Sequence, residues 1–261
     1  MTVGCIKPDP AEIVQPLETT LGAAVPAAYL AAVSMAALDG RPSPCASVVT
    51  PAGSATDVRV DVSLGPGCPP MFGADGSGTA VVTGTWTPQF ATFVMDFTGL
   101  SYDGRSMLVV GIASMTVAPV DTTHLVIAYG EQDILAGNGS TAAGGLKQVA
   151  WVVDVDTAGT DDPSDDSIAI SGGDQALFAA GGPTPQADAT QVAVGNAVFK
   201  AGCRKNPSSG VAAVQRAGTQ GGGWVLFGFH GACDGTADVV AALAPYELLI
   251  TSSLPLAFLQ R

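Results

Sequence analysis

An acidic stretch offers the clearest chance of chemistry in this chain. Asp154, Asp156, Asp162 and Asp165 lie within twelve residues, with Gly159 between them. Calcium takes six to eight oxygen ligands, which Asp-rich loops supply. The spacing fits positions 1, 3, 9 and 12 of a twelve-residue calcium loop, but alanine stands at position 5 and the flanks read as strands, which excludes an EF-hand. The stretch predicts a looser calcium site or, alternatively, a solvated acidic loop; no other cofactor is indicated.

Two histidines are the other residues that could do chemistry. His124 follows Asp121, and His230 precedes Asp234. A hydrolase built on serine, histidine and aspartate would have to use one of them as its base. No serine stands in the Gly-x-Ser-x-Gly turn that exposes a nucleophile. A secreted hydrolase that uses His124 or His230 is therefore an alternative, and a non-catalytic protein is the favoured interpretation.

Four of the five cysteines form two pairs that each bracket a β-like segment. The favoured disulfides are Cys45–Cys68 and Cys203–Cys233, and the other two connectivities of four cysteines stay open. Disulfides persist in oxidising compartments, so the pairs indicate an extracytoplasmic protein, at the cell surface, in the periplasm or secreted. A bond between Cys203 and Cys233 would also use the sulfurs that could bind zinc together with His230.

The fifth cysteine, Cys5, follows the small and apolar residues Thr2-Val3-Gly4. This arrangement resembles the lipid-attachment box of a bacterial lipoprotein, and the resemblance implies a covalent lipid anchor at Cys5. Residues 202–207 and 229–235 resemble the C-terminal β region of uncharacterised secreted lipoproteins of high-GC bacteria. This second resemblance implies export and β structure for the C-terminal part of the chain, and no activity.

The composition limits the partners. The net charge is −13, while only 13% of the residues are charged. An acidic surface repels phosphate backbones, which argues against nucleic acid as a partner. It also repels anionic lipid headgroups, so contact with a membrane would depend on the lipid anchor. A protein or glycan partner stays open, and so does self-association.

The elements that must position these residues read as one helix followed by many strands. Residues 21–38 are apolar and rich in alanine, and Asp39-Gly40 follows, which predicts a buried helix with Gly40 in a left-handed cap. Further on, about a dozen short segments alternate apolar and polar residues between turn signals. The fold class is therefore all-β, an antiparallel sandwich or barrel with one N-terminal helix.

Three tryptophans, Trp86, Trp151 and Trp224, are expected in the core rather than on a ligand-binding face. Residues 224–229 are apolar on both faces, which predicts a strand in the centre of a sandwich.

The chain divides into three parts. Residues 1–20 contain three prolines and read as an extended tether, and residues 21–40 as a helix packed on the β domain. Residues 41–261 read as one large β domain, in which 181–188 is the best candidate for a subdivision.

These patterns predict an exported, non-catalytic cell-envelope protein that acts as a binding or assembly module and is anchored by lipid. The alternatives are a self-assembling shell or fibre subunit, to which the apolar helix and low charge would supply contacts, and the hydrolase described above.

Overall fold

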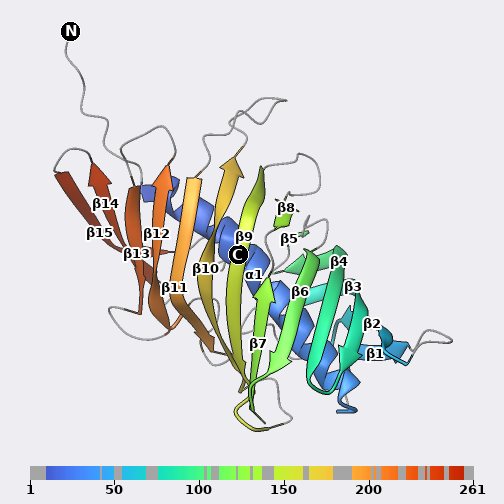
Figure 1. Cartoon of the computed structure of the whole chain (residues 1–261). Helices are drawn as coiled ribbons and strands as arrows, with labels where there is room; N and C mark the ends of the chain where they lie inside the picture. Colours follow the sequence, from blue (N-terminus) through green and yellow to red (C-terminus); the bar gives the residue numbers. More distant parts are fainter. Residues whose placement is uncertain are drawn as a thin grey trace.

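The apolar N-terminal segment forms one long helix, and the alternating segments that follow form strands of one antiparallel sheet (Figure 1). This computed structural model describes residues 10–41, 43–49, 55–68, 76–102, 105–106, 112–121, 123–129, 132–136, 144–160, 165–178, 190–200, 203, 207–216, 222–228, 233, 236–243 and 247–255. The elements are α1 (Pro10–Leu38), β1 (Ala46–Val49), β2 (Asp57–Leu64), β3 (Gly76–Thr87), β4 (Phe90–Tyr102), β5 (Arg105–Ser106), β6 (Ile112–Pro119), β7 (His124–Tyr129), β8 (Gln132–Ala136), β9 (Gly144–Asp156), β10 (Ser167–Phe178), β11 (Thr190–Lys200), β12 (Ser209–Arg216), β13 (Gly222–Phe227), β14 (Thr236–Leu243) and β15 (Glu247–Pro255).

The strands cross the sheet almost in chain order. The order is β1-β2-β3-β4-β6-β7-β9-β10-β11-β12-β13-β14-β15, while β5 pairs with β4 and β8 pairs with β9. Each pairing is antiparallel, and the neighbours on this path other than β4–β6 and β7–β9 are consecutive in the chain. The predicted class, antiparallel all-β with one N-terminal helix, is confirmed. The strands form a single sheet that does not close, and α1 takes the place that a second sheet has in a sandwich.

The alternation read from the sequence is visible in the strands. In β2, Val58, Val60, Val62 and Leu64 are buried, while the residues between them are exposed or half-buried. Inward side chains of this kind from most of the strands form one core with the helix. The sheet therefore buries one face and leaves the other to solvent, as antiparallel sheets commonly do.

The middle of α1 is buried on all sides. The sheet curves around it, and strands from β1 to β14 contact the helix (Figure 1). Ala24, Val25, Ala27, Ala28 and Leu30 are each 0% exposed, although they lie on different sides of the helix. Its many alanines add little width, so the strands can approach the helix closely. The helix predicted to pack on the β domain is therefore enclosed by it.

The helix begins earlier than the sequence predicted. Residues 10–20, interpreted above as part of a tether, are helical, and Pro16 and Pro26 lie inside the helix. Within residues 10–20, Pro16 removes one backbone hydrogen bond at a cost of about 3 kcal/mol. Leu17 and Leu21 are both 0% exposed in this part of the helix, and burying such side chains contributes about 1.5–3 kcal/mol each. Burial against the sheet therefore outweighs the local preference of proline.

The C-terminus of the helix ends as the sequence predicted. Gly40 has φ +79°, the left-handed conformation that glycine adopts without strain. The Arg41 N–H donates to the Ala36 carbonyl at 3.0 Å, and the Gly40 N–H donates to the Ala37 carbonyl at 3.1 Å. This pair of bonds is the Schellman motif, which satisfies carbonyls that the last turn would leave free.

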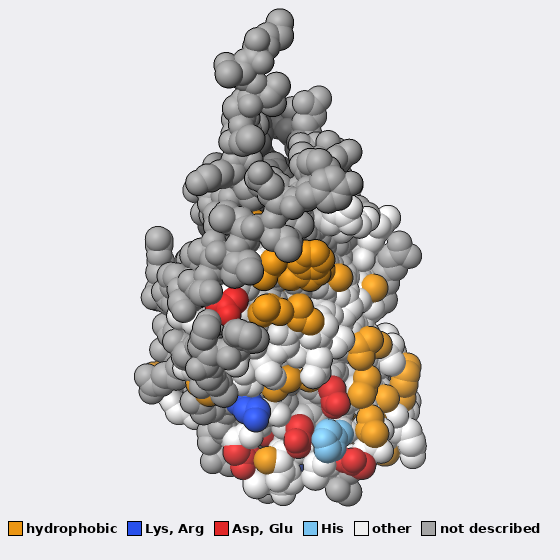
Figure 2. All heavy atoms as spheres, turned by 90° about the vertical axis from the view of Figure 1, so that its left-hand side faces the viewer, with side chains coloured by type: hydrophobic (Ala, Val, Ile, Leu, Met, Phe, Trp, Pro, Cys, Tyr) orange, Lys and Arg blue, Asp and Glu red, His pale blue; other side chains and the backbone are white. Residues whose placement is uncertain are grey.

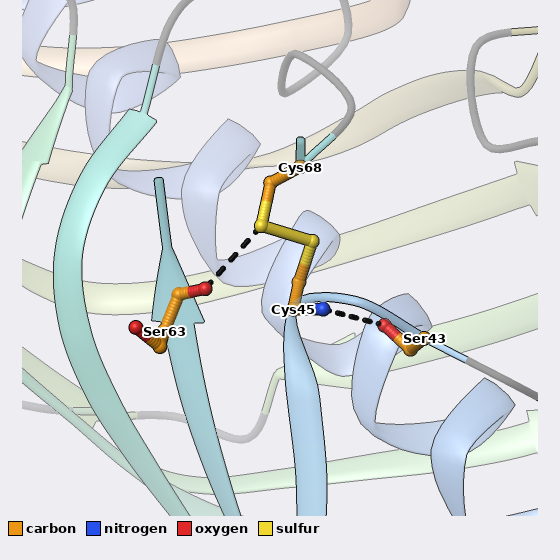
Figure 3. The surroundings of a disulfide bond; sticks show 4 residues. All are labelled: Ser43, Cys45, Ser63 and Cys68. Atoms are coloured by element: carbon orange, nitrogen blue, oxygen red, sulfur yellow. Dashed lines mark hydrogen bonds between the residues drawn. A yellow bond between two sulfur atoms is a disulfide. The ribbon is translucent and has the colours of Figure 1, made fainter. Parts of the chain in front are cut away.

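Two disulfides connect the residues paired from the sequence. Cys45 is bonded to Cys68, and Cys203 to Cys233, with 23 and 30 residues of separation. Figure 3 shows the first bond, which ties the start of β1 to the segment after β2; the Cys45 N–H donates to Ser43 Oγ at 3.2 Å. The second bond joins the segment after β11 to the segment before β14.

The three predicted core tryptophans differ in exposure. Trp151 on β9 is 0% exposed and packs edge-on against Tyr129 at 5.4 Å between ring centroids. Trp86 is partly buried against the core. Trp224 on β13 is 45% exposed, so the prediction that it belongs to the core was wrong. Among the described strands, which form one sheet, no second layer covers the outward face of β13.

Candidate functional site

The turn between β6 and β7 is organised by one carboxylate. Asp121 accepts hydrogen bonds from the Thr123 N–H at 2.7 Å and the His124 N–H at 2.9 Å. It also accepts the Thr123 hydroxyl at 3.0 Å and lies 3.1 Å from His124 Nδ1. The Thr123 N–H, followed by the His124 ring, lowers the pKa of Asp121 to about 2. Asp121 is therefore an anionic cap that fixes the turn.

His124 lies between two carboxylates. Its Nδ1 faces Asp121, and its Nε2 lies 3.8 Å from Asp156 Oδ2 on β9. The hydrogen bond to Asp121, together with the negative charges of Asp121, Asp156 and Asp154, raises the pKa of His124. In Figure 2 a histidine side chain, in pale blue, lies among acidic side chains, in red, at the lower end of the face shown. The ring thus links the β6–β7 turn to β9.

A cleft of about 330 Å³ opens beside this link. Its lining includes Arg41 after α1, Asp121 and His124 at the turn, and Thr157 and Thr160 after β9. The Thr157 N–H donates to the Thr123 carbonyl at 2.8 Å, which holds the loop after β9 against the turn. The cleft is therefore framed by segments that are joined to one another.

The acidic stretch does not bring its predicted ligands together in the described part of the chain. Asp154 and Asp156 are two residues apart on β9, and Asp156 accepts the Ala158 N–H at 2.9 Å. Asp165 accepts the Thr160 hydroxyl at 2.9 Å. Among the described residues, no group of three or more His, Cys, Asp or Glu side chains has the arrangement of a metal site. Asp162 lies outside the described residues, so the calcium site stays a prediction.

The geometry at His124 differs from that of a catalytic base. A serine hydrolase leaves one ring nitrogen for the nucleophile and uses the other for the aspartate. Both nitrogens of His124 face carboxylates, and the Thr123 hydroxyl, 2.8 Å from Nδ1, also donates to Asp121. His230, the other candidate base, lies outside the described residues. So do Cys5 and the candidate subdivision at 181–188.

The sequence reasoning missed a buried carboxyl group. Asp174 on β10 is 5% exposed and lies between the sheet and α1. It accepts the Thr20 hydroxyl of α1 at 3.1 Å and the Trp151 indole N–H of β9 at 2.9 Å. Burial raises the pKa of Asp174 to about 6, against the lowering effect of these two hydrogen bonds. Its sequence neighbours Gly172 and Gly173 mark the irregular part of β10, which was the only available signal.

A shallow depression lies on the outward face of the sheet above this irregularity. It measures about 280 Å³, and its lining includes Gln148, Gln191, Gln215, Ala193 and Ala213. Asp174 and Val192 also line it, but the Asp174 carboxylate is held by Thr20 and Trp151. The three glutamines are exposed, and none of them had been singled out from the sequence.

Comparison with known proteins gave no relative. No protein-family model, no curated protein and no solved structure matches this chain. The function therefore has to be inferred from the residues of the chain and their arrangement.

Proposed function

We propose that this protein is an exported, non-catalytic component of the cell envelope that acts as a binding or assembly module and is held by a lipid on Cys5. The observation that carries the proposal is the filled interior of the curved sheet. Because α1 occupies the inside, with residues 23–31 buried, partners have to be met at the outer face, the strand edges and the surface clefts. A surface of this kind suits binding without chemistry.

The extracytoplasmic location is supported by the two disulfides, since such bonds are rare in reducing compartments. Thr20–Leu38 is also long and apolar enough for a membrane span or a signal sequence, by length and composition alone. In this structure 72% of that segment is buried inside the fold, so enclosure by the sheet is a second reason for its apolar character. The resemblance of Cys5 and its neighbours to a lipid-attachment box supports the anchor.

The non-catalytic part is supported by the surroundings of His124. The two ring nitrogens of His124 face carboxylates, Asp121 at 3.1 Å and Asp156 at 3.8 Å, whereas the base of a serine hydrolase directs one ring nitrogen at the nucleophile. The ring therefore serves to join two segments of the structure.

The anchor is tested by fractionating a bacterial host that exports and lipidates the full protein. The wild-type protein is expected in the membrane fraction, and Cys5→Ser is expected to move it to the soluble extracytoplasmic fraction. A non-reducing peptide map of the same samples should show both disulfides. Free thiols at Cys45 and Cys203 would contradict export, whereas a Cys5→Ser protein that stays with the membrane would contradict the anchor alone.

The absence of catalysis is tested by screening the purified protein against esterase, glycosidase and peptidase substrates. No turnover above that of a His124→Ala, His230→Ala double variant is expected. Turnover that is lost in either single variant would show that the protein is a hydrolase.

A second candidate function, assembly into a shell or fibre, is favoured by the open sheet. Among the described strands, β1 and β15 each pair on one side only, and Val48 and Val49 on β1 are 40% and 44% exposed. Free strand edges can pair with another chain, and edges that meet head to tail extend without closing. Sedimentation velocity over a range of protein concentrations tests this: a constant monomer peak excludes assembly, and growing species that a Val48→Lys variant prevents would establish it.

A further inference from the structure

The outward face of β11, β12 and β13 carries a neutral surface with an aromatic side chain beside a groove. These three strands lie side by side in the sheet (Figure 1). Ala193 on β11 is opposite Ala213 on β12, which in turn is opposite Trp224 on β13. Their neighbours Val192, Val214 and Val225 are buried on the inner face, so this row points outward.

The small side chains of this row lie beside larger ones. The two alanines lie in the depression of about 280 Å³, and Gln191 and Gln215, opposite each other in the next outward row, line it together with Gln148. Trp224 stands next to Ala213 and is 45% exposed. A flat ligand lying over the alanines would therefore meet an indole on one side and amide groups on the other.

This surface is neutral on a strongly acidic protein. The outward positions at 191–195 of β11, 211–215 of β12 and 222–226 of β13 carry glutamine, alanine, glycine, valine, tryptophan and leucine, and no charged side chain. The whole chain has a net charge of −13. Such a surface offers no ion pair to a charged ligand, and the surrounding negative field disfavours anions.

The glutamine amides and the exposed indole of this face fit a ligand with many hydroxyl groups. A glutamine amide both donates and accepts hydrogen bonds, which matches hydroxyl groups that do the same. An exposed indole face is apolar and electron-rich, and the C–H face of a pyranose ring packs against it. A purely apolar partner would leave the glutamine amides without hydrogen bonds, which costs about 1–3 kcal/mol for each buried group.

We propose that the outward face formed by Trp224, Ala213, Ala193, Gln191 and Gln215 binds a neutral glycan chain. This inference rests on the proposed function as an envelope binding module and names the ligand class for it. The sugar ring stacks on Trp224, and the glutamines bind the hydroxyl groups of the sugar that lies over the alanines. Sugars without charge are the occupants because the outward residues of the face carry no charge, and the Asp174 carboxylate that also lines the depression is held by Thr20 and Trp151.

The test uses the full chain and three neutral hexasaccharides, linear oligomers of glucose, of galactose and of mannose. Binding is followed by isothermal titration calorimetry at low and at high salt. At least one hexasaccharide is expected to bind with an affinity that salt does not change. Trp224→Ala should weaken that binding roughly tenfold or more, as expected for an aromatic anchor, and a Gln191→Ala, Gln215→Ala double variant should also weaken it.

Two variants make the result specific. Trp224→Phe keeps an aromatic ring and should retain most of the binding. Val94→Ala changes a side chain of similar exposure, 46%, on β4 outside this face and should bind like the wild type. Equal loss in Val94→Ala and Trp224→Ala would overturn the assignment of the face, since the effect would then be general.

Three other outcomes would overturn the proposal. These are no binding of any hexasaccharide by the wild-type protein, binding that Trp224→Ala leaves unchanged, and self-association that Trp224→Ala abolishes, which would make a second copy of the chain the occupant. Membrane fractionation of Cys5→Ser and the turnover screen are independent of Trp224. The proposed envelope function can therefore stand when the glycan proposal fails, and the two failures are distinguishable.

Discussion

At the scale of single residues, Asp174 is the group with the clearest consequence for stability. It is buried between β9, β10 and α1, where Trp151 and Thr20 donate to it. Its pKa is raised from 3.8 to about 6, with burial as the largest cause. The described groups that face Asp174 from α1 and β9 are neutral, so the shift comes from desolvation and not from a neighbouring charge.

The sign of the pH dependence follows from that shift. Between about pH 4 and pH 6 the folded protein binds a proton at Asp174 that the unfolded chain does not, so the folded state gains stability as the pH falls. A pKa shift of this size corresponds to a gain of up to about 3 kcal/mol in the free energy of unfolding. We expect Asp174→Asn to remove this part of the pH dependence while an amide oxygen still accepts a hydrogen bond.

The measurement is urea unfolding of wild type and Asp174→Asn at several pH values from 4 to 7. Asp154→Asn is the matched control, because Asp154 is exposed on the outer face of β9. If the slope of stability against pH is the same in Asp174→Asn and wild type, Asp174 is not the titrating group.

His124 has the opposite electrostatic setting, since it is exposed to water and placed between Asp121 and Asp156. Its pKa is raised, first by the hydrogen bond to Asp121. The stabilisation from the cationic ring is complete below pH 6.5 and is lost as the pH rises through the higher pKa of the folded state. We expect Asp121→Asn to lower the pKa of His124 in an NMR titration of its ring protons. Asp61→Asn, on the distant strand β2, should leave it unchanged; equal shifts in both variants would exclude the specific contact.

At the scale of elements, two glycines of the α1 region should respond in opposite directions to alanine. Gly40 has φ +79° and nothing within 4 Å of an added Cβ, so Gly40→Ala adds strain alone and should lower the free energy of unfolding by about 1 kcal/mol. Gly22 also has nothing within 4 Å, but it lies inside the helix with ordinary φ. Gly22→Ala should therefore stabilise the protein by about 0.5–1 kcal/mol.

Thermal unfolding of the two variants beside wild type tests the pair. The sign matters more than the size, because both changes add one methyl group to the same helical segment. Destabilisation by both would show that the space around Gly22 is filled in solution. A neutral Gly40→Ala would show that the Schellman cap is not formed.

At the scale of the whole molecule, the two disulfides link segments in different parts of an open sheet. Cys45–Cys68 lies beside β1 and β2, and Cys203–Cys233 connects the segments after β11 and before β14. With sequence separations of 23 and 30 residues, each bond should contribute about 3.5 kcal/mol by limiting the unfolded chain. An open sheet gains from this, since no closing strand pair restrains its edges.

We expect replacement of Cys45 and Cys68 by serine to lower the unfolding midpoint in urea. Reduced wild-type protein, which lacks both bonds, should have a lower midpoint than this variant, which keeps one. Cys203 and Cys233 give the matched second pair. A midpoint that neither the substitutions nor the reducing agent changes would show that the bonds are absent from the folded protein in solution.

Much of the fold could be predicted from the sequence, because its signals are local. Short segments that alternate apolar and polar residues predicted strands, of which β2 is an example, and Asp39-Gly40 predicted the helix cap. The order of the cysteines predicted the two bonds that the structure contains. The start of α1 was wrong because proline preference is local, whereas the burial of Leu17 and Leu21 depends on strands far along the chain.

The sequence by itself determined the strands, the single helix, the acidic and weakly charged surface and the disulfide pairs, since each depends on neighbouring residues or on a short list of cysteines. Only the tertiary structure decided that the strands form one open sheet around the helix, that Asp174 is buried beneath Trp151, and that Trp224 faces outward beside Ala213 and the glutamines. A strand with apolar residues on both faces gives no sign of which face is covered. That choice depends on the curvature of the whole sheet and on the helix that fills one side of it.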